Sequence, residues 1–187
     1  MSDYLMRDAA PIDSKGWEEI DEEVLEVVTK VLVGRRFVRL VGPLGWGVEQ
    51  APVFSSRVKD GLTQADDAPR YVPLQTLEQS FLLKAKHLAM AAASPFGWDK
   101  GPIAIAASAL AKEEDAVVLG GLLAAKGKLT APLGDWSTMG EPFQAVVKAQ
   151  ALLRAAGADG PFALVCDPIM YARLASLMQH GRRELDL

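Results

Sequence analysis

Few residues of this chain have side chains that catalysis could use. Its 187 residues include two histidines, His87 and His180, and one cysteine, Cys166. A serine-type triad would need one of the histidines as its base. His87 lies among lysines, which favours a structural or exposed role, and His180 lies at a predicted helix end, where it would interact with the helix dipole. Cys166 lies in an apolar segment, which favours an inert buried thiol.

A run of three acidic residues is the other candidate for acid–base chemistry or metal binding. Glu113, Glu114 and Asp115 are consecutive, and consecutive side chains on a helix point in different directions. We therefore interpret the run as a solvated helix face or an inter-subunit salt bridge. The short motifs typical of phosphate-binding loops, zinc proteases and serine hydrolases are absent from the sequence. The sequence thus predicts no catalytic residue, no metal site and no cofactor.

Composition narrows the class of protein further. Half of the residues are hydrophobic, and 20 basic against 24 acidic residues give a net charge of -4. A globular protein is expected, with no nucleic-acid partner, because a phosphate-binding surface needs clustered Lys and Arg. A single cysteine excludes an internal disulfide. The longest apolar run, 103–110, is too short to span a bilayer, and no secretory signal is visible. We expect a soluble cytoplasmic protein without a membrane partner.

The N-terminal third of the chain predicts a helix followed by a strand. Asp13 or Ser14 can cap the helix, and Gly34 is a plausible stop. Residues 37–41 then read as a strand that ends in the turn 42–47. The apolar positions of the helix recur in steps of three and four and are Trp17, Ile20, Val24, Val27, Val28 and Val31.

The segment that follows is polar and irregular, from residue 53 to residue 71. We predict a long extended arm or hairpin there, which is unusual inside a compact domain. Such an arm cannot bury itself in its own monomer and is explained most simply by partner subunits. Residues 74–88 are a further candidate strand.

Helices dominate the rest of the predicted chain. A helix is expected over 103–123, then a loop over 126–140. A second helix begins at Pro142 and ends near Gly157. A short buried strand is expected over 162–166, followed by a helix capped by Asp167. The fold class is therefore α+β.

Several segments resemble a known family in the right order. They lie at 10–11, 17–21, 32–38 and 42–47, and again at 129–136, 143–146 and 160–165. In all of them the sequence resembles the encapsulins, bacterial nanocompartment shell proteins also called linocin-like. The resemblance implies the HK97-type capsid fold, with an N-terminal helix, an extended loop, a peripheral domain with a spine helix, and a partial axial domain.

The same resemblance implies a domain layout. Residues 1–52 would form the N-terminal helix and first strand of the peripheral domain, and 53–82 the extended inter-subunit loop. Residues 83–141 would form the peripheral domain with its spine helix. Residues 142–187 would form the axial domain, which is incomplete because family members are longer. The chain would then be a fragment, a truncated form, or one partner of a split shell protein whose second chain supplies the missing part.

By resemblance, the chain would self-assemble into an icosahedral cage around a cargo enzyme of ferritin-like or peroxidase type, with iron storage as one role. The cargo would dock through a C-terminal targeting peptide. The matching docking positions are Val28, Val31, Leu32, Arg35 and Arg39. An apolar groove with a few hydrogen-bonding groups suits a short peptide. The alternative is that the three apolar residues are simply core.

Two other interpretations stay open. Some family members bind flavin through an aromatic residue after the extended loop, but the region around Lys86 has no tryptophan, so no cofactor is expected. A phage or prophage major capsid protein of the same fold is one alternative function. A peptidase is the other, although the sequence supplies no nucleophile–base pair for it.

Overall fold

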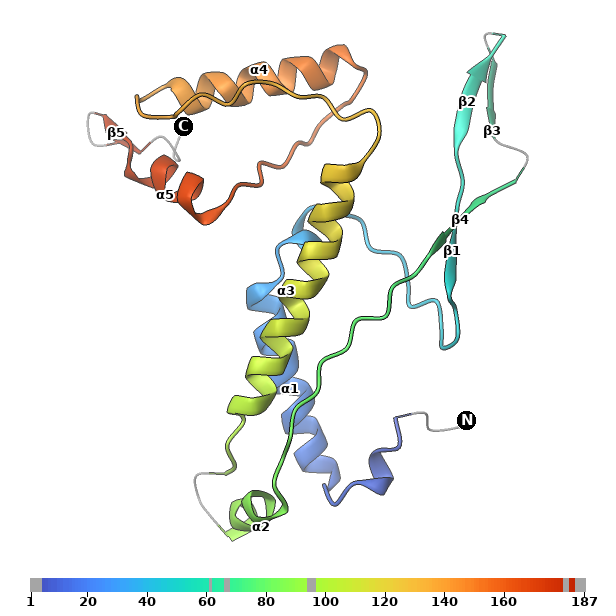
Figure 1. Cartoon of the computed structure of the whole chain (residues 1–187), viewed down its shortest axis with the longest axis vertical. Helices are drawn as coiled ribbons and strands as arrows, with labels where there is room; N and C mark the ends of the chain where they lie inside the picture. The colour runs from blue at the N-terminus through green and yellow to red at the C-terminus, as the bar shows by residue number, and fades with distance from the viewer. Residues whose placement is uncertain (1–4, 61, 66–67, 94–96, 180–181, 184–187) are drawn as a thin grey trace. The chain divides into compact units, whose positions relative to one another are not determined.

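A computed structural model describes residues 5–60, 62–65, 68–93, 97–179 and 182–183 (Figure 1). The chain divides into two compact units, Met1–Leu122 and Leu123–Leu187, and each is described separately below. Both contain helices and short antiparallel strands, so the predicted α+β class is confirmed. Among the described residues, no helix combines the length and apolarity needed to cross a bilayer.

The predicted N-terminal helix is confirmed as α1, Ser14–Val31. Asp13 caps it, because its carboxylate accepts a hydrogen bond from the Gly16 amide at 2.8 Å. A short 3-10 helix, η1 at Arg7–Ala9, precedes it. Arg7 donates two hydrogen bonds of 2.8 Å to the Asp21 carboxylate and lies 4.9 Å from the Trp17 ring centre. This ties the segment before the helix to its first turns.

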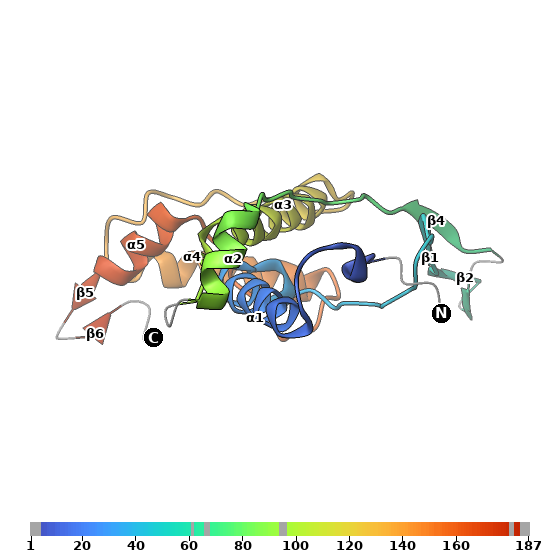
Figure 2. The same cartoon turned by 90° about the horizontal axis from the view of Figure 1, so that it is seen from below.

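Unit 1 is built on α1 and the long helix α3, Gly101–Ala124, which lie side by side (Figures 1 and 2). The predicted helix over 103–123 is therefore confirmed. Four residues of α3 are buried, and three of them are alanines: Ile103, Ala106, Ala107 and Ala111. Trp98, just before α3, donates a 2.8 Å hydrogen bond from its indole to Glu19 of α1. The buried apolar residues of unit 1 are Ile20, Leu32, Ile103, Ala106, Ala107 and Ala111.

The predicted arm is a hairpin made of two paired segments. Strand β1, Gln50–Val53, pairs antiparallel with β4, Arg70–Pro73. Farther out, β2 at Ser56–Lys59 pairs with β3 at Leu62–Ala65. Each described strand of the arm pairs only with its hairpin partner, and Phe54 is exposed beside them. A lone two-stranded hairpin is marginal in water, so this arm needs a further surface to rest on.

Three predicted strands are wrong. Residues 37–41 follow a second 3-10 helix, η2 at Gly34–Arg36, and form no ladder. Within 74–88, the first part is irregular and the last four residues begin helix α2, Ala85–Ala93, whose alanines favour a helix. Residues 162–166 are extended but unpaired, and mostly exposed. A strand needs a neighbouring ladder as well as suitable side chains.

Unit 2 contains two predicted helices, both confirmed. Helix α4, Glu141–Ala155, has Pro142 in its first turn. Helix α5, Pro168–Ser176, is capped by Asp167, which accepts hydrogen bonds of 2.8 and 2.9 Å from the next amides. Two short strands, β5 at Met178–Gln179 and β6 at Arg182–Arg183, close the described part. The buried side chains described in unit 2 are Trp136, Pro142 and Leu174.

Candidate functional site

The five predicted docking residues lie at the end of α1 and just beyond it. Val28 and Val31 are half-buried on α1, and Leu32, directly after it, is only 6% exposed. Arg35 lies in η2, and Arg39 lies in the irregular segment that follows; both are exposed. Leu32 is therefore a core residue in this structure, which agrees with the alternative that the apolar docking positions are simply core. The other four residues keep surface that a peptide could contact.

The turn after α1 is held by an acidic residue of α3. The Asp115 carboxylate accepts hydrogen bonds from the Val33 amide at 2.9 Å and from the Gly34 amide at 2.7 Å. Gly34 is buried, and a Cβ there would lie 3.0 Å from the Asp115 carboxylate and 3.1 Å from Val118. Only glycine allows this close approach without displacing its neighbours.

A second acidic residue of α3, Glu114, fixes the side chain of Arg35. Its guanidinium donates to the two oxygens of Glu114, at 2.6 and 2.8 Å. This hydrogen bond raises the pKa of Arg35, which stays charged. The pair is partly exposed, so its net contribution to stability is about 1 kcal/mol or less. Because two parallel hydrogen bonds join the groups, the pair orients the Arg35 side chain more than it stabilises the fold. We call the bonds made by Glu114 and Asp115 to residues 33–35 the α1–α3 clasp.

The clasp corrects the interpretation of the acidic run 113–115. We expected a solvated face or an inter-subunit salt bridge, but Glu114 and Asp115 bond within the chain. Glu113 accepts a 3.1 Å hydrogen bond from Gln79. Sequence reasoning missed this because the partners are about 80 residues apart. The sequence marked Gly34 only as a helix stop and gave no sign of the acceptor that its amide finds.

One exposed apolar residue beside the site was also missed. Leu25 is 66% exposed and lies one turn before Val28 on α1. It falls outside the apolar stripe that packs α1 in its own chain. An apolar residue on the polar side of an amphipathic helix was the signal that could have revealed it. With Val28 and Val31 it widens the apolar surface of this helix.

The residues first considered for catalysis do not converge on a site. His87 lies on α2 and is exposed, and Cys166 is half-buried in the other unit. His180 lies outside the described residues. In the part of the chain that the structure describes, no group of three or more His, Cys, Asp or Glu side chains is placed to hold a metal ion. Around the end of α1, the structure places the half-buried Val28 and Val31 in the same stretch of chain as the exposed Arg35 and Arg39.

A family model described as "Encapsulating protein for peroxidase" matches residues 1–186. The type 1 encapsulin shell protein EncA of Myxococcus xanthus is 33% identical over 193 residues, which cover 93% of this chain and 67% of that protein. The chain belongs to the encapsulin shell-protein family. The type 1 encapsulin shell protein of Rhodospirillum rubrum is 32% identical over 208 residues, covering 96% of this chain and 72% of that one.

A solved virus-like particle confirms the predicted capsid-type fold. The virus-like particle of Pyrococcus furiosus matches with a TM-score of 0.72 and 22% identity, over 90% of this chain and 67% of that one. This chain therefore has the capsid-type fold. As a member of the encapsulin family, it is a shell-forming structural protein. Encapsulin shells are also found fused to other modules, since a diheme-cytochrome–encapsulin fusion of Kuenenia stuttgartiensis is 32% identical over 181 residues, 87% of this chain and 50% of that protein.

Proposed function

We propose that many copies of this chain assemble into an icosahedral encapsulin compartment in the bacterial cytoplasm, which encloses a cargo enzyme while the chain itself catalyses nothing. The observation that carries this proposal is the surface of the isolated chain. Within each unit, large apolar side chains that a folded monomer would be expected to bury are exposed. They include Leu25 at 66% and Ile105 at 72% in unit 1, and Leu164 at 56% and Ile169 at 69% in unit 2.

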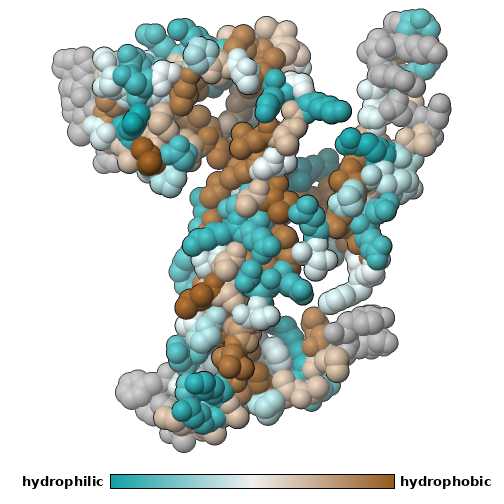
Figure 3. All heavy atoms as spheres, viewed as in Figure 1, coloured by the Kyte–Doolittle hydropathy of each residue, from teal (hydrophilic) through white to brown (hydrophobic). Residues whose placement is uncertain are grey.

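Exposed apolar side chains of this kind are what a subunit interface requires. Leu82, Phe54 and Val41 each expose about three quarters of their surface. Figure 3 shows apolar side chains interspersed with polar ones over the visible face. Exposed apolar surface on this scale marks interaction sites in soluble proteins. The arm 53–82 carries part of it, and we propose that the arm crosses to a neighbouring subunit.

The second part of the proposal concerns cargo. Val28 and Val31 would form the floor of a docking surface, with Leu32 packed beneath them, and Arg35 and Arg39 would bind the carbonyl groups of the cargo's targeting peptide. The α1–α3 clasp supports this role, because it holds Arg35 in one direction before any peptide binds. The family description favours a peroxidase as cargo. A ferritin-like protein, and so iron storage, is the alternative.

Assembly is tested by sedimentation velocity on the purified chain and on a Phe54→Asp variant. We expect large particles from the wild-type chain and a smaller species from the variant, whose charge would be buried under a neighbour. A matched Ser55→Asp variant, one residue along on the same arm, separates a general effect of charge from loss of the apolar contact. Monomers from the wild-type chain would count against assembly by this chain alone.

Cargo docking is tested by co-expression with a peroxidase or a ferritin-like protein that carries a C-terminal targeting peptide. The measured quantity is the ratio of cargo to shell protein in purified particles. Val28→Asp should lower this ratio at least tenfold, and Val147→Asp, on a helix of the other unit, should leave it unchanged. Equal ratios in both variants would show that cargo docks elsewhere. DNA inside the particles would favour a phage capsid instead.

A further inference from the structure

Basic side chains gather in the sequence where α1 ends, and no acidic residue interrupts them. The stretch 27–41 contains no Asp or Glu, and its basic residues are Lys30, Arg35, Arg36 and Arg39. Lys30 pairs with Glu26 on the same helix, and Arg35 pairs with Glu114 of α3. Two of the four positive charges are therefore neutralised within the chain.

The other two cations, Arg36 and Arg39, keep their charge unpaired. Both are exposed, and within the described part of the chain no carboxylate forms an ion pair with either of them. Arg36 donates a 3.3 Å hydrogen bond to the backbone carbonyl of Lys30 and so caps the end of α1. This bond uses one of the five donors of its guanidinium and neutralises none of its charge.

The same hydrogen bond places the guanidinium of Arg36 beside the apolar docking positions. The carbonyl that it binds belongs to the last turn of α1, which also carries Val28 and Val31. Both valines are half-buried and keep some surface. A polypeptide segment that rests on these two side chains therefore lies within reach of Arg36.

A guanidinium beside apolar surface selects the charge of its partner. A bound segment displaces water from the guanidinium as well as from the apolar side chains, and an unpaired charge then becomes costly. A carboxylate offsets this cost through two parallel hydrogen bonds and an opposite charge, whereas a neutral carbonyl supplies neither. A basic side chain at the same place would meet a like charge, which disfavours binding.

We propose that the docking surface at the end of α1 selects an acidic peptide, whose apolar residues rest on Val28 and Val31 and whose adjoining carboxylate pairs with Arg36. Arg39 is the second cation of this carboxylate site. The inference rests on the proposed cargo docking and refines it. Arg35 keeps a peptide carbonyl as its partner, because Glu114 already neutralises it, while Arg39 binds a carboxylate in place of a carbonyl. The carboxylate belongs to an Asp or Glu side chain or to the free C-terminus of the peptide.

The first experiment obtains ligands for this surface without assuming their sequence. The full 187-residue chain is immobilised and used to select binders from a display library of random decapeptides whose C-termini are free. The Phe54→Asp variant, which is expected to assemble less, is used in parallel so that assembly cannot hide the surface. Val28→Ser removes apolar surface without adding charge, and the peptides wanted are those that it binds at least tenfold more weakly. If no such peptide is found, the inference is overturned.

The second experiment measures what the carboxylate contributes. Each selected peptide is synthesised in four forms, which are the parent, the parent with Asn and Gln in place of its Asp and Glu, the parent with an amidated C-terminus, and the form with both changes. Fluorescence anisotropy should show about fivefold or more weaker binding for the form without any carboxylate. The two singly changed forms identify the source of the carboxylate. Equal affinities of the parent and the doubly changed form would contradict the proposal.

A third set of variants assigns the carboxylate to its partners. Arg36→Gln keeps a donor for the Lys30 carbonyl and removes only the charge, and it is combined with Arg39→Gln. The double variant should bind the parent and the carboxylate-free peptide within about twofold of each other. Arg70→Gln, which removes an exposed charge from β4, is the matched control and should keep the full preference. A double variant that also keeps it would show that other groups bind the carboxylate.

The failures of the two proposals are distinguishable. Binding that depends on Val28 but ignores the carboxylate leaves cargo docking intact and overturns the acidic preference. A preference for carboxylates in peptides that bind Val28→Ser as tightly as the unchanged chain would mean that the arginines act apart from the docking surface, which overturns the inference. A preference for basic peptides would do the same.

Discussion

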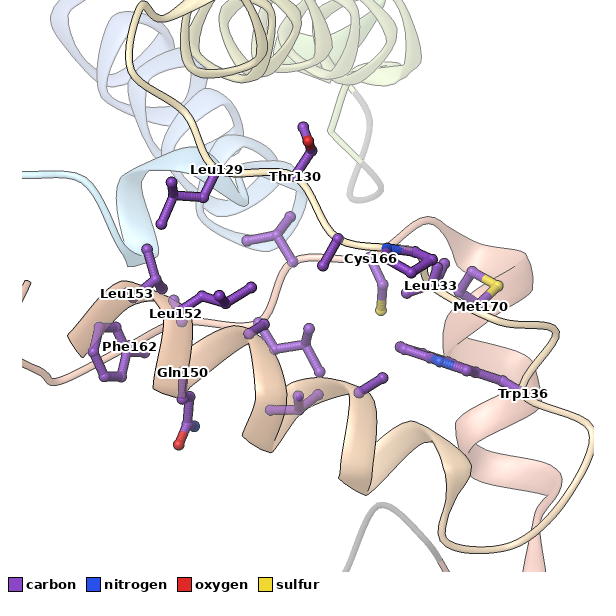
Figure 4. A pocket seen from close by; sticks show the side chains of 18 of the residues that line it. Leu129, Thr130, Leu133, Trp136, Gln150, Leu152, Leu153, Phe162, Cys166 and Met170 are labelled. Atoms are coloured by element: carbon purple, nitrogen blue, oxygen red, sulfur yellow. The ribbon is translucent and has the colours of Figure 1, made fainter. Parts of the chain in front are cut away.

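Units 1 and 2 differ in how completely each buries its own apolar side chains. In unit 1, Ile20 of α1 is buried, as are Ile103, Ala106, Ala107 and Ala111 of α3, and the clasp fixes the turn after α1. In unit 2, α4 and two extended segments, 129–136 and 162–166, line an apolar cavity of about 690 Å³ that no described side chain of the unit fills (Figure 4). The difference lies in whether the complementary surface belongs to the same unit.

The first prediction targets the packed region and carries the largest effect. Ile103 is fully buried, so Ile103→Ala should lower the free energy of unfolding by about 3 kcal/mol through lost burial and a residual cavity. Ile105→Ala on the same helix is the control, because Ile105 is 72% exposed. Urea unfolding followed by circular dichroism measures both. Equal losses from the two variants would contradict the assigned α1–α3 interface.

The clasp should show the next largest effect. Asp115→Ala leaves two backbone amides without their acceptor, one of them on buried Gly34, and should cost about 1–3 kcal/mol. Glu113→Ala, two residues away with a single exposed hydrogen bond, should cost far less. The same unfolding assay compares them. If the Asp115 variant is as stable as wild type, the turn is held by something other than the clasp.

A smaller, pH-dependent effect is expected at the N-terminus. The hydrogen bond from Arg7 lowers the pKa of Asp21 from its ordinary value of 3.8. A depressed folded-state pKa contributes stability above the ordinary value, and this is lost as the pH falls through the folded-state pKa. The pair is largely exposed, so the contribution is below about 1 kcal/mol.

Asp21→Asn should therefore be less stable than wild type at pH 7, and the difference should vanish below the folded-state pKa of Asp21, at a pH under 3.8. Unfolding curves for both proteins across this range measure it. Asp8→Asn, another acidic residue of the same region, controls for the loss of one negative charge. A difference that stays constant with pH would mean that the bond to Arg7 contributes nothing.

Most helices were predicted correctly from the sequence, whereas three predicted strands were wrong. The reason is that a helix forms its hydrogen bonds locally and a strand does not. Helix α1 was visible because its cap, its apolar spacing and its internal hydrogen bonds are all local. Segment 162–166 has the composition of a strand, but a strand is completed by a ladder that composition cannot supply. Helix α2 was missed because its first residues lie at the end of 74–88, where we predicted a strand, although its alanines favour a helix.

The candidate site was predictable only in part. The apolar positions Val28 and Val31 follow from helix periodicity, whereas their docking role came from the family resemblance alone. The clasp was out of reach, because Asp115 and Gly34 are 81 residues apart and become neighbours only when α1 packs on α3. The expected inter-subunit bridge at 113–115 was wrong for the same reason.

Electron microscopy of the purified chain, alone and with the unmatched part of the Myxococcus xanthus shell protein added, tests the central claim most directly. A shell subunit should give closed particles of uniform diameter in at least one of the two samples. Dispersed monomers in both samples, from protein shown to be folded by circular dichroism, would contradict it.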